Sequence, residues 1–340
     1  MGKEIGIVGA GSWGIALAYL LSKNGHKVIV WSRRQETVDK LRAYHGNEDK
    51  LPGVILDDSV EFTCSIEETV KDKDLIVLVV PSAHMRETVK LMAPFINGTE
   101  EHPQIIVNCS KGIEEETLMV MSDVILDEIP GCQVCVMSGP SHAEEVGRGM
   151  PTSIVVGAFD KDTARYVQNV FMSNVFRVYI SPDMQGIEIG AALKNVIALA
   201  AGIADGYGLG DNAKAALITR GIAEIGRLGM AMGGKFETFS GLSGIGDLIV
   251  TCASMHSRNR RAGILIGQGK SMQEAMDEVK MVVEGVYSAK AARLLAEKYE
   301  VEMPIVTVVN QVLFEGKTPE EALNDLMIRD KKIESSNLDW

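Results

Sequence analysis

The sequence predicts an α/β domain built on a parallel sheet, followed by an all-helical domain. The first half of the 340-residue chain alternates short apolar runs with helical stretches, which is typical of a sheet covered by helices on both faces. After about residue 185 the strand signal disappears and only helical periodicity remains. The chain also exceeds about 250–300 residues, where single hydrophobic cores usually stop growing. We therefore expect two domains, over residues 1–185 and 186–340.

Composition places the chain among folded proteins and excludes several classes of function. Hydrophobic residues make up 46% and charged residues 24% of the sequence, which is normal for globular domains. A net charge of −12 repels nucleic acid and anionic lipid. The most apolar run, around residues 191–203, is interrupted by Lys194 and is too short to cross a bilayer, and no signal peptide is recognisable. We expect a cytoplasmic protein with no nucleic-acid partner and no membrane insertion.

The cysteines indicate neither disulfides nor a metal. Five scattered cysteines leave one unpaired in any scheme, so we expect free thiols. Cys132 and Cys135 form a Cys-x-x-Cys, but no second pair follows, and structural zinc requires four ligands. We predict no metal site.

Five apolar runs predict the strands of the sheet, over residues 4–8, 27–31, 75–80, 105–108 and 134–137. Continuous apolar strands are what a parallel sheet buried on both faces requires. The spacing Ser/Thr-x-x-Glu of a capping box begins at Ser65, Ser271 and Thr318, and each predicts the start of a helix. Pro319 occupies the first helical position, where its missing N–H costs nothing.

A glycine-rich turn, GAGSWG over residues 9–14, follows the first strand directly and opens a helical run. In this context Gly9 permits the tight turn, Gly11 lets the backbone approach a pyrophosphate, and Gly14 lets the helix pack close to the strand. The unpaired N–H groups of the helix N-terminus then bind the diphosphate. The turn predicts a Rossmann domain that binds a nicotinamide dinucleotide. The alternative is a purely structural glycine turn.

The end of the second strand bears on the choice of dinucleotide. An acidic residue there would bind the ribose 2′-hydroxyl of NAD, but this chain has Ser32, Arg33 and Arg34. Two guanidinium groups suit a 2′-phosphate, so NADPH is favoured and NADH remains possible. Alternatively, the two arginines are solvated and both cofactors are accepted.

Lys194 is an anomaly in the second domain. Residues 187–199 are apolar nearly all round, as buried helices are, and an ammonium group is rarely buried unless it is paired. Gly190 and Ala191 share its helical face and leave room for an approaching group. This pattern favours a catalytic or ligand-binding lysine over one whose side chain extends to solvent.

Two further segments of the second domain carry polar groups suited to a site. Asp247 and Thr251 are four residues apart and share a helical face, so Asp247 either orients Lys194 or a substrate hydroxyl, or simply stabilises a helix N-terminus. The segment SRNRR over residues 257–261 combines guanidinium, hydroxyl and amide groups that suit a phosphate. A solvated helix face is its alternative, above all for Arg260 and Arg261.

Two loops of the first domain follow predicted strands, over residues 110–112 and 138–143. Ligands of open α/β sheets bind at the carboxyl ends of strands, so both loops should face the cofactor. His142 lies beside Glu144 and Glu145, and we interpret it as a loop residue rather than a general base.

Taken together and in order, the segments GAGSWG, WSRR, SKG, SGPSHAEE, KNVIALAAG, LSGIGDLIVTC, SRNRR and VVEG resemble the NAD(P)-dependent glycerol-3-phosphate dehydrogenases of the bacterial type. The resemblance covers nearly the whole chain. It implies interconversion of dihydroxyacetone phosphate and sn-glycerol 3-phosphate, which supplies glycerophospholipid synthesis. It also implies a helical half like that of 6-phosphogluconate dehydrogenase, and a homodimer.

The resemblance further implies the residues of the site. Lys194 and Asp247 would be catalytic, with Lys194 as the general acid/base. The dinucleotide would contact Gly9, Gly11, Ser12, Trp13, Gly14, Arg33, Arg34, Lys111, Ala143, Arg258, Val282 and Glu284. The substrate would contact Lys111, Gly139, Ser141, Lys194, Asn195, Asp247, Ser257, Arg258 and Asn259. His142 stands where the family often has Phe or Tyr, which weakens any role for it.

Other readings share the Rossmann domain. Hydroxyacid, 6-phosphogluconate and UDP-sugar dehydrogenases also join it to helices, but LSGIGDLIVTC and SRNRR separate this chain from them. A redox sensor that binds NADPH without turnover would have no need for Lys194 in an apolar helix.

If Lys194 donates the proton in the reaction, its pKa must fall toward neutrality. Burial and Lys111 would lower this pKa, and Asp247 would raise it.

Overall fold

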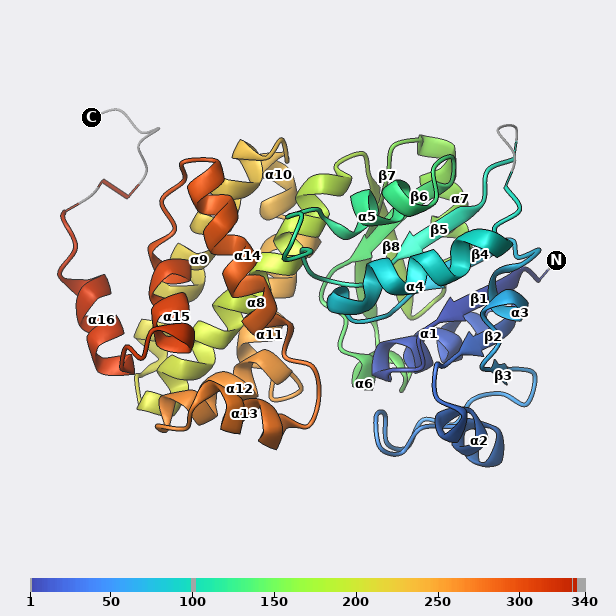
Figure 1. The fold of residues 1–340 in the computed structure, drawn as a ribbon, viewed down its shortest axis with the longest axis horizontal. Coiled ribbons are helices and arrows are strands. Elements are labelled where there is room, and N and C mark those ends of the chain that lie inside the picture. The colour runs from blue at the N-terminus through green and yellow to red at the C-terminus, as the bar shows by residue number, and fades with distance from the viewer. Residues whose placement is uncertain (1, 99–101, 332, 335–340) are drawn as a thin grey trace.

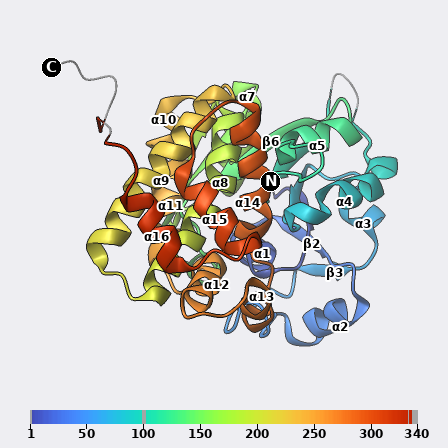
Figure 2. The same ribbon diagram turned by 60° about the vertical axis from the view of Figure 1, so that its left-hand side comes forward.

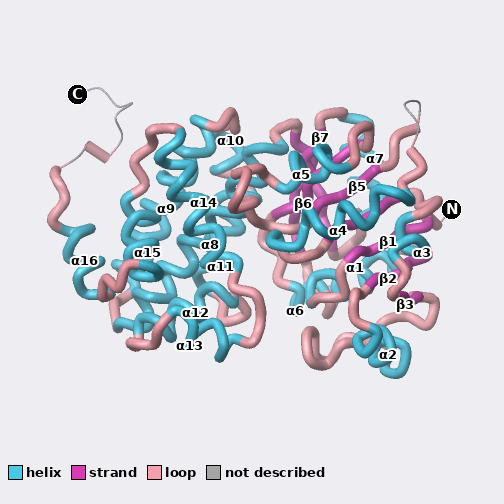
Figure 3. The backbone as a smooth tube through the Cα atoms, in the orientation of Figure 1, coloured by secondary structure: helices cyan, strands magenta, loops and turns pink. Residues whose placement is uncertain are grey.

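Strands and helices segregate into two lobes. In the computed structural model, which describes residues 2–98, 102–331 and 333–334, the strands lie in one lobe and a bundle of helices forms the other (Figure 3). The predicted fold class, a Rossmann domain followed by a helical domain, is thus confirmed. The last residues of the predicted second domain, 335–340, lie outside the described residues.

The sheet of the first lobe has eight strands in the order β3-β2-β1-β4-β5-β6-β7-β8. The strand order reverses between β1 and β4, and in such sheets the ligand crevice lies at the carboxyl ends beside this point. The five predicted strands are confirmed as β1, β2, β4, β5 and β6. The bounds are β1 (Glu4–Val8), β2 (Lys27–Trp31), β3 (Glu61–Thr63), β4 (Leu75–Leu78), β5 (Ile105–Asn108), β6 (Gln133–Ser138), β7 (Thr152–Ala158) and β8 (Phe176–Ser181).

The sheet departs from the expected parallel arrangement at one place. Strand β7 runs antiparallel to β6, with Ser138 opposite Val155, and β8 is again parallel to β7. A parallel connection needs a crossover, usually a full helix. The segment between β6 and β7 contains only the short helix α6 (Ala143–Val146), so the chain turns back at the same edge of the sheet.

Helices cover both faces of this sheet (Figure 1). One apolar cluster joins the strands to α1, α2 and α7, and a second joins them to α3, α4 and α5. Both faces are therefore buried, as the continuous apolar strands predicted. The bounds are α1 (Ser12–Lys23), α2 (Gln35–Tyr44), α3 (Ile66–Val70), the 3₁₀ turns η1 (Ser82–His84) and η2 (Ala93–Phe95), α4 (Met85–Met92), α5 (Met121–Glu128) and α7 (Lys161–Phe171).

The second lobe packs around one central helix, α8, which α9, α11, α12 and α14 surround (Figure 2). By length and hydropathy α8 could cross a membrane, but 94% of its apolar window is buried inside the protein, so it is a core helix. The bounds are α8 (Met184–Tyr207), α9 (Asp211–Ala231), α10 (Phe236–Phe239), the π-helical turn η3 (Leu242–Gly246), α11 (Asp247–Ala253), α12 (Arg258–Gly267), α13 (Met272–Val279), α14 (Glu284–Lys298), α15 (Pro304–Phe314) and α16 (Pro319–Met327).

The predicted helix starts fall where the capping spacing placed them. Reciprocal capping boxes form at Ser271 and Thr318. Ser65 also accepts the backbone N–H of Glu68, but the Glu68 carboxylate accepts the Thr63 hydroxyl instead of returning to Ser65. Helix α8 begins at Met184, next to the boundary predicted after residue 185, which stays a prediction.

Candidate active site

The glycine turn has the geometry of a diphosphate cradle. Gly9 has φ +125°, and a Cβ on Gly14 would lie 1.9 Å from the carbonyl oxygen of Gly9. No atom lies within 4 Å of where a Cβ of Gly11 would be. Helix α1 begins at Ser12 without a side-chain cap, so its first N–H groups are free to bind an anion. The residues of this turn therefore fit the diphosphate of a dinucleotide.

Two exposed guanidinium groups follow β2. Arg33 has 57% of its side chain exposed and lies 3.8 Å from Glu87 Oε2, a long and solvated ion pair. Arg34 is the N-cap residue of α2, and its side chain is exposed. Neither arginine is held by a short ion pair, so both are accessible at the edge where the adenosine half of a dinucleotide lies in this fold.

The loops after β5 and β6 meet at the same edge of the sheet. Lys111, which follows β5, donates from Nζ to the carbonyl oxygen of Gly139, at 3.3 Å. Ser141 Oγ donates to the same carbonyl oxygen, at 2.9 Å. The structure thus brings together the two loops that the sequence predicted to face the cofactor.

Lys194 and Lys111 share one carboxylate. Lys194 Nζ donates to Asp247 Oδ1 at 2.6 Å and to Thr251 Oγ1 at 2.7 Å. Lys111 Nζ donates to the other oxygen, Asp247 Oδ2, at 2.7 Å. Lys194 is 6% and Asp247 2% exposed, so the predicted anomaly is a buried ammonium with a partner. An ammonium has three N–H donors, and two of those of Lys194 are hydrogen-bonded to Asp247 and Thr251.

A close backbone approach places Asp247 beside Lys194. A Cβ on Gly190 of α8 would lie 3.0 Å from the carbonyl oxygen of Ser243 in η3. Because η3 leads directly into α11, this approach sets the first turn of α11 against the face of α8 that carries Lys194. The sequence predicted that Gly190 leaves room for an approaching group. That group is the backbone of η3.

Burial and neighbouring charges tune this cluster. Burial lowers the pKa of Lys194 to about 8; Asp247 opposes this effect and Lys111 adds to it. Burial alone would raise the pKa of Asp247, but Lys111 and Lys194 outweigh it and hold that pKa below its usual range. A lysine with a pKa near 8 exchanges a proton close to neutral pH, as a reversible acid/base requires.

Segment 257–261 divides into structural and available groups. Ser257 Oγ caps α12 by accepting the Arg260 N–H, and Arg260 itself pairs with Asp205 at 2.7 Å. Asn259 donates to Asn195 Oδ1 at 2.9 Å and accepts the N–H of Gly285 at 2.8 Å. The guanidinium of the half-buried Arg258, in contrast, makes no hydrogen bond or ion pair within the described residues.

The start of α14 reaches across to the sheet. Glu284 accepts hydrogen bonds from the backbone N–H of Ser82, at 3.2 Å, and from its hydroxyl, at 2.6 Å. Burial raises the pKa of Glu284 even though Ser82 and Arg258 favour its charged form. Val282 lies two residues before Glu284, and Ala143 begins α6. The groups predicted to enclose the dinucleotide therefore come from both lobes.

His142 lies near the cluster without a hydrogen bond to Lys194 or Asp247. Its ring is 5.8 Å from that of His256, and its Nε2 is 3.5 Å from the carbonyl oxygen of Val250. Burial, and then the Lys194 charge, lower the pKa of His142. A ring with a lowered pKa and no hydrogen bond to either group, on the residue that precedes α6, fits its interpretation as a loop residue.

The cysteines are free, and burial raises the pKa of Cys132 to about 11 and of Cys135 to about 12. Such thiols stay protonated and unreactive. Across residues 2–98, 102–331 and 333–334, no three His, Cys, Asp or Glu side chains are grouped to hold a metal ion.

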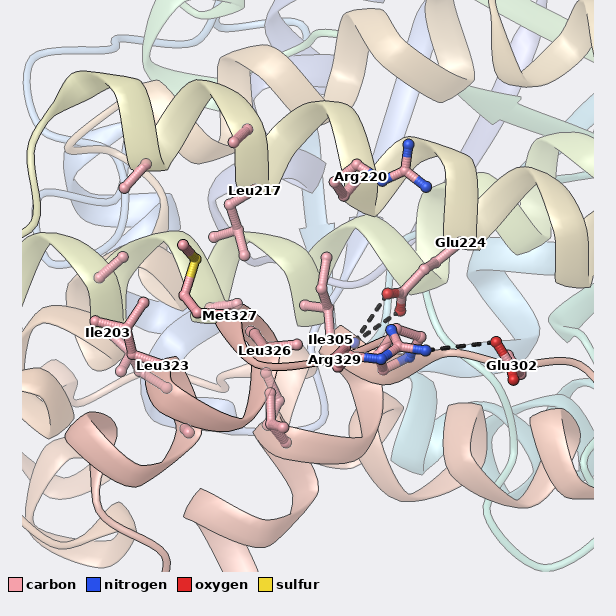
Figure 4. A pocket seen from close by; sticks show the side chains of 18 of the residues that line it. Ile203, Leu217, Arg220, Glu224, Glu302, Ile305, Leu323, Leu326, Met327 and Arg329 are labelled. Atoms are coloured by element: carbon pink, nitrogen blue, oxygen red, sulfur yellow. Dashed lines mark hydrogen bonds and ion pairs between the residues drawn. The ribbon is translucent and has the colours of Figure 1, made fainter. Parts of the chain in front are cut away.

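A pocket of about 1010 Å³ lies elsewhere, between α8, α9, α15 and α16 (Figure 4). Its lining is mostly apolar, with Arg220, Glu224 and Arg329 at one end. It contains neither Lys194 nor Arg258, so it is separate from the cluster described above.

The sequence did not single out every group in the cluster. Thr251 was noted only for sharing a face with Asp247, although its hydroxyl is a direct acceptor for Lys194. Ser82 was missed; its signal is its position four residues after the end of β4, at the carboxyl edge where ligands bind.

Comparison with known proteins assigns both lobes. Residues 4–164 match the family model described as the N-terminus of NAD-dependent glycerol-3-phosphate dehydrogenase, and residues 183–324 match its C-terminus. The glycerol-3-phosphate dehydrogenase (NAD(P)+) of Agathobacter rectalis is 61% identical over 338 residues, 99% of each chain. That of Fusobacterium nucleatum is 57% identical, over 97% of this chain and 98% of the relative. A crystal structure of glycerol-3-phosphate dehydrogenase from Coxiella burnetii superposes with a TM-score of 0.92 at 36% identity, over 96% of this chain and 99% of that one.

Proposed function

Because the chain belongs to the NAD-dependent glycerol-3-phosphate dehydrogenase family, we propose that Lys194 is the proton donor in its reaction and that NADPH is the preferred reductant. The reaction itself is the NAD(P)H-dependent reduction of dihydroxyacetone phosphate to glycerol 3-phosphate. The observation that carries the proposal is the buried Lys194 ammonium, with two donors fixed by Asp247 and Thr251 and a third left for a substrate oxygen.

With its diphosphate held by the turn of Gly9, Gly11 and Gly14, a bound reduced dinucleotide would supply the hydride for the carbonyl carbon of the substrate. Lys194 Nζ gives a proton to the carbonyl oxygen, so the C=O bond becomes a C–OH and no free alkoxide forms. The N–H bond electrons stay on Nζ, and the resulting amine regains a proton from solvent. Asp247 stabilises the ammonium form before transfer, and burial favours the amine after it.

Arg258 is the proposed partner of the substrate phosphate. Its half-buried guanidinium has no hydrogen bond or ion pair in the described part of the chain, and burial lowers its pKa, while Glu284 and Glu144 oppose this. A planar guanidinium fork suits two phosphate oxygens. We assign Lys111, Gly139, Ser141, Asn195, Ser257 and Asn259 to the same substrate site.

The preference for NADPH rests on Arg33 and Arg34, which are accessible after β2 in a position without a carboxylate. We assign the diphosphate to the turn of Gly9, Gly11 and Gly14. The remaining proposed contacts to the dinucleotide are Ser12, Trp13, Lys111, Ala143, Arg258, Val282 and Glu284.

We further propose that the enzyme works in the cytoplasm and supplies the backbone of glycerophospholipids. Five free thiols suit a reducing compartment. The homodimer implied by the family resemblance stays a prediction, which sedimentation analysis would test.

The substitution Lys194→Ala tests the proton donor. We expect kcat for dihydroxyacetone phosphate reduction to fall by about 10²–10⁴, the usual contribution of a general acid, while NADPH affinity changes little. Lys317→Ala, which removes a lysine paired with Asp325 on α16, is the matched control and should retain activity. Near-normal turnover in Lys194→Ala would contradict the assignment.

A further inference from the structure

A second buried ionisable group lies on α8, and the reaction described above does not use it. Glu188 is 5% exposed and precedes Lys194 by fewer than two helical turns. Its Oε1 accepts the backbone N–H of Ser122, at 2.9 Å, and the side-chain amide of Asn108, at 3.0 Å. Its Oε2 accepts the Ser122 hydroxyl. All three donors belong to the sheet domain.

Asn108 connects this carboxyl to the Lys111 loop. It is the last residue of β5, and its Oδ1 accepts the backbone N–H of Ser110 at 2.9 Å while its amide also donates to the Ser110 carbonyl. Lys111 is the next residue and binds Asp247 Oδ2. A closed ring of contacts therefore runs from Glu188 of α8 through Asn108, Ser110, Lys111 and Asp247 to Lys194 of the same helix.

Helix capping alone does not account for this arrangement. Glu224 on α9 is an equally buried carboxyl that accepts the backbone N–H of Ile305 at the start of α15 (Figure 4). It also accepts the backbone N–H of Val306. Burial raises the pKa of both Glu188 and Glu224 to about 7, and Asp123 adds to the effect at Glu188. Only Glu188 also holds a side chain that fixes a loop of the active site.

We propose that Glu188 is a positioning residue for the reaction: it ties the Lys111 loop to α8 and thereby holds the Lys111 ammonium on Asp247, opposite Lys194. This inference rests on the proposed roles of Lys194 and Lys111. Without the tie, Lys111 leaves Asp247. Because Lys111 lowers the pKa of Lys194, the loss of the Lys111 ammonium from the cluster raises that pKa. The other ionisable neighbours of Lys194, Cys252 and His142, are unchanged.

The experiment compares Glu188→Ala with Glu188→Gln and with Glu224→Ala. The glutamine keeps an acceptor for Ser122 and Asn108 and donates to the Ser122 hydroxyl, so it should restore near-normal kinetics. In Glu188→Ala we expect kcat/KM for dihydroxyacetone phosphate to fall by about tenfold to a hundredfold, and the pH midpoint of kcat to move above about 8. Glu224→Ala should lower the Tm but leave this midpoint in place.

A second variant, Asn108→Ala, cuts the same ring if Glu188→Ala does not fold, and it should raise the midpoint in the same way. If Glu188→Ala folds but keeps the wild-type pH midpoint of kcat and the wild-type KM, the proposal is overturned. If Glu188→Ala does not fold, the same result in Asn108→Ala overturns it. Lys194→Ala, measured in parallel, separates the two ideas. If it retains turnover, the acid/base role itself is wrong; if it is inactive while the midpoint stays fixed in the ring variants, only the role of Glu188 is wrong.

Discussion

Replacing Asp247 by Asn removes the charge between the two lysines and nearly preserves the shape of the side chain. At the observed 2.6 Å between Lys194 Nζ and Asp247 Oδ1, a pair of unit charges interacts by about 1.6 kcal/mol with the screening of water and about 6 kcal/mol at an effective dielectric constant of 20. Even the smaller value corresponds to about one pH unit. The pH midpoint of kcat in reduction should therefore fall from about 8 by at least about one unit.

Lys111→Met should have the opposite effect. Lys111 lowers the pKa of Lys194, so removing it should raise the midpoint, even though the lost substrate contact also lowers kcat/KM. The assay is single-turnover loss of NADPH absorbance across the pH range, with circular dichroism to check folding, because removing one partner of a buried pair costs about 3–5 kcal/mol. Midpoints that stay at the wild-type value, or move in the same direction in both variants, would refute this account of the cluster.

Three other predictions address cofactor, substrate and stability. In the double variant Arg33→Ala, Arg34→Ala, kcat/KM should fall about tenfold to a hundredfold for NADPH and little for NADH; equal losses would contradict 2′-phosphate recognition. Arg258→Lys should raise KM for dihydroxyacetone phosphate about tenfold or more, because the bidentate fork is lost; an unchanged KM would place the phosphate elsewhere. Burial raises the pKa of Glu224 from 4.5 to about 7, so the folded protein binds the extra proton and loses up to about 3 kcal/mol of stability as pH rises through that window. Glu188 contributes a similar loss in both proteins, so urea unfolding should show a loss that is smaller in Glu224→Gln than in the wild type by up to about 3 kcal/mol; identical pH dependence in both would argue against a neutral Glu224.

The sequence predicted those parts of the fold and site that depend on local patterns. Apolar runs located β1, β2, β4, β5 and β6, and an ammonium within the apolar stretch of α8 made Lys194 conspicuous. The spacing of Asp247 and Thr251 correctly placed both side chains on one helical face. Each of these signals lies within one element, where side-chain periodicity determines burial.

Contacts between distant segments could not be read from such patterns. Lys111 and Asp247 are 136 residues apart, and no local property of the Lys111 loop indicates that it shares a carboxylate with Lys194. The antiparallel direction of β7 follows from the short connection after β6 and not from the β7 residues themselves. The first four residues of β8 alternate between buried and exposed, which is typical of a strand with one solvated face and differs from the continuous apolar pattern of the central strands.

Glu188 is a different case, because its signal was present in the sequence. A carboxylate in the same apolar helix is as anomalous as the Lys194 ammonium. Its partners, Asn108 and Ser122, come from the other lobe, so its role becomes visible only when both lobes are in place.

The central claim, that Lys194 exchanges the proton in the reaction, is tested most directly by single-turnover rates of the wild-type enzyme in both directions. Reduction needs the ammonium and oxidation needs the amine. The rate of reduction should therefore fall, and that of glycerol 3-phosphate oxidation should rise, through one common midpoint near pH 8. Rates that change in the same sense in both directions, or that do not change between about pH 7 and pH 9, would contradict the claim.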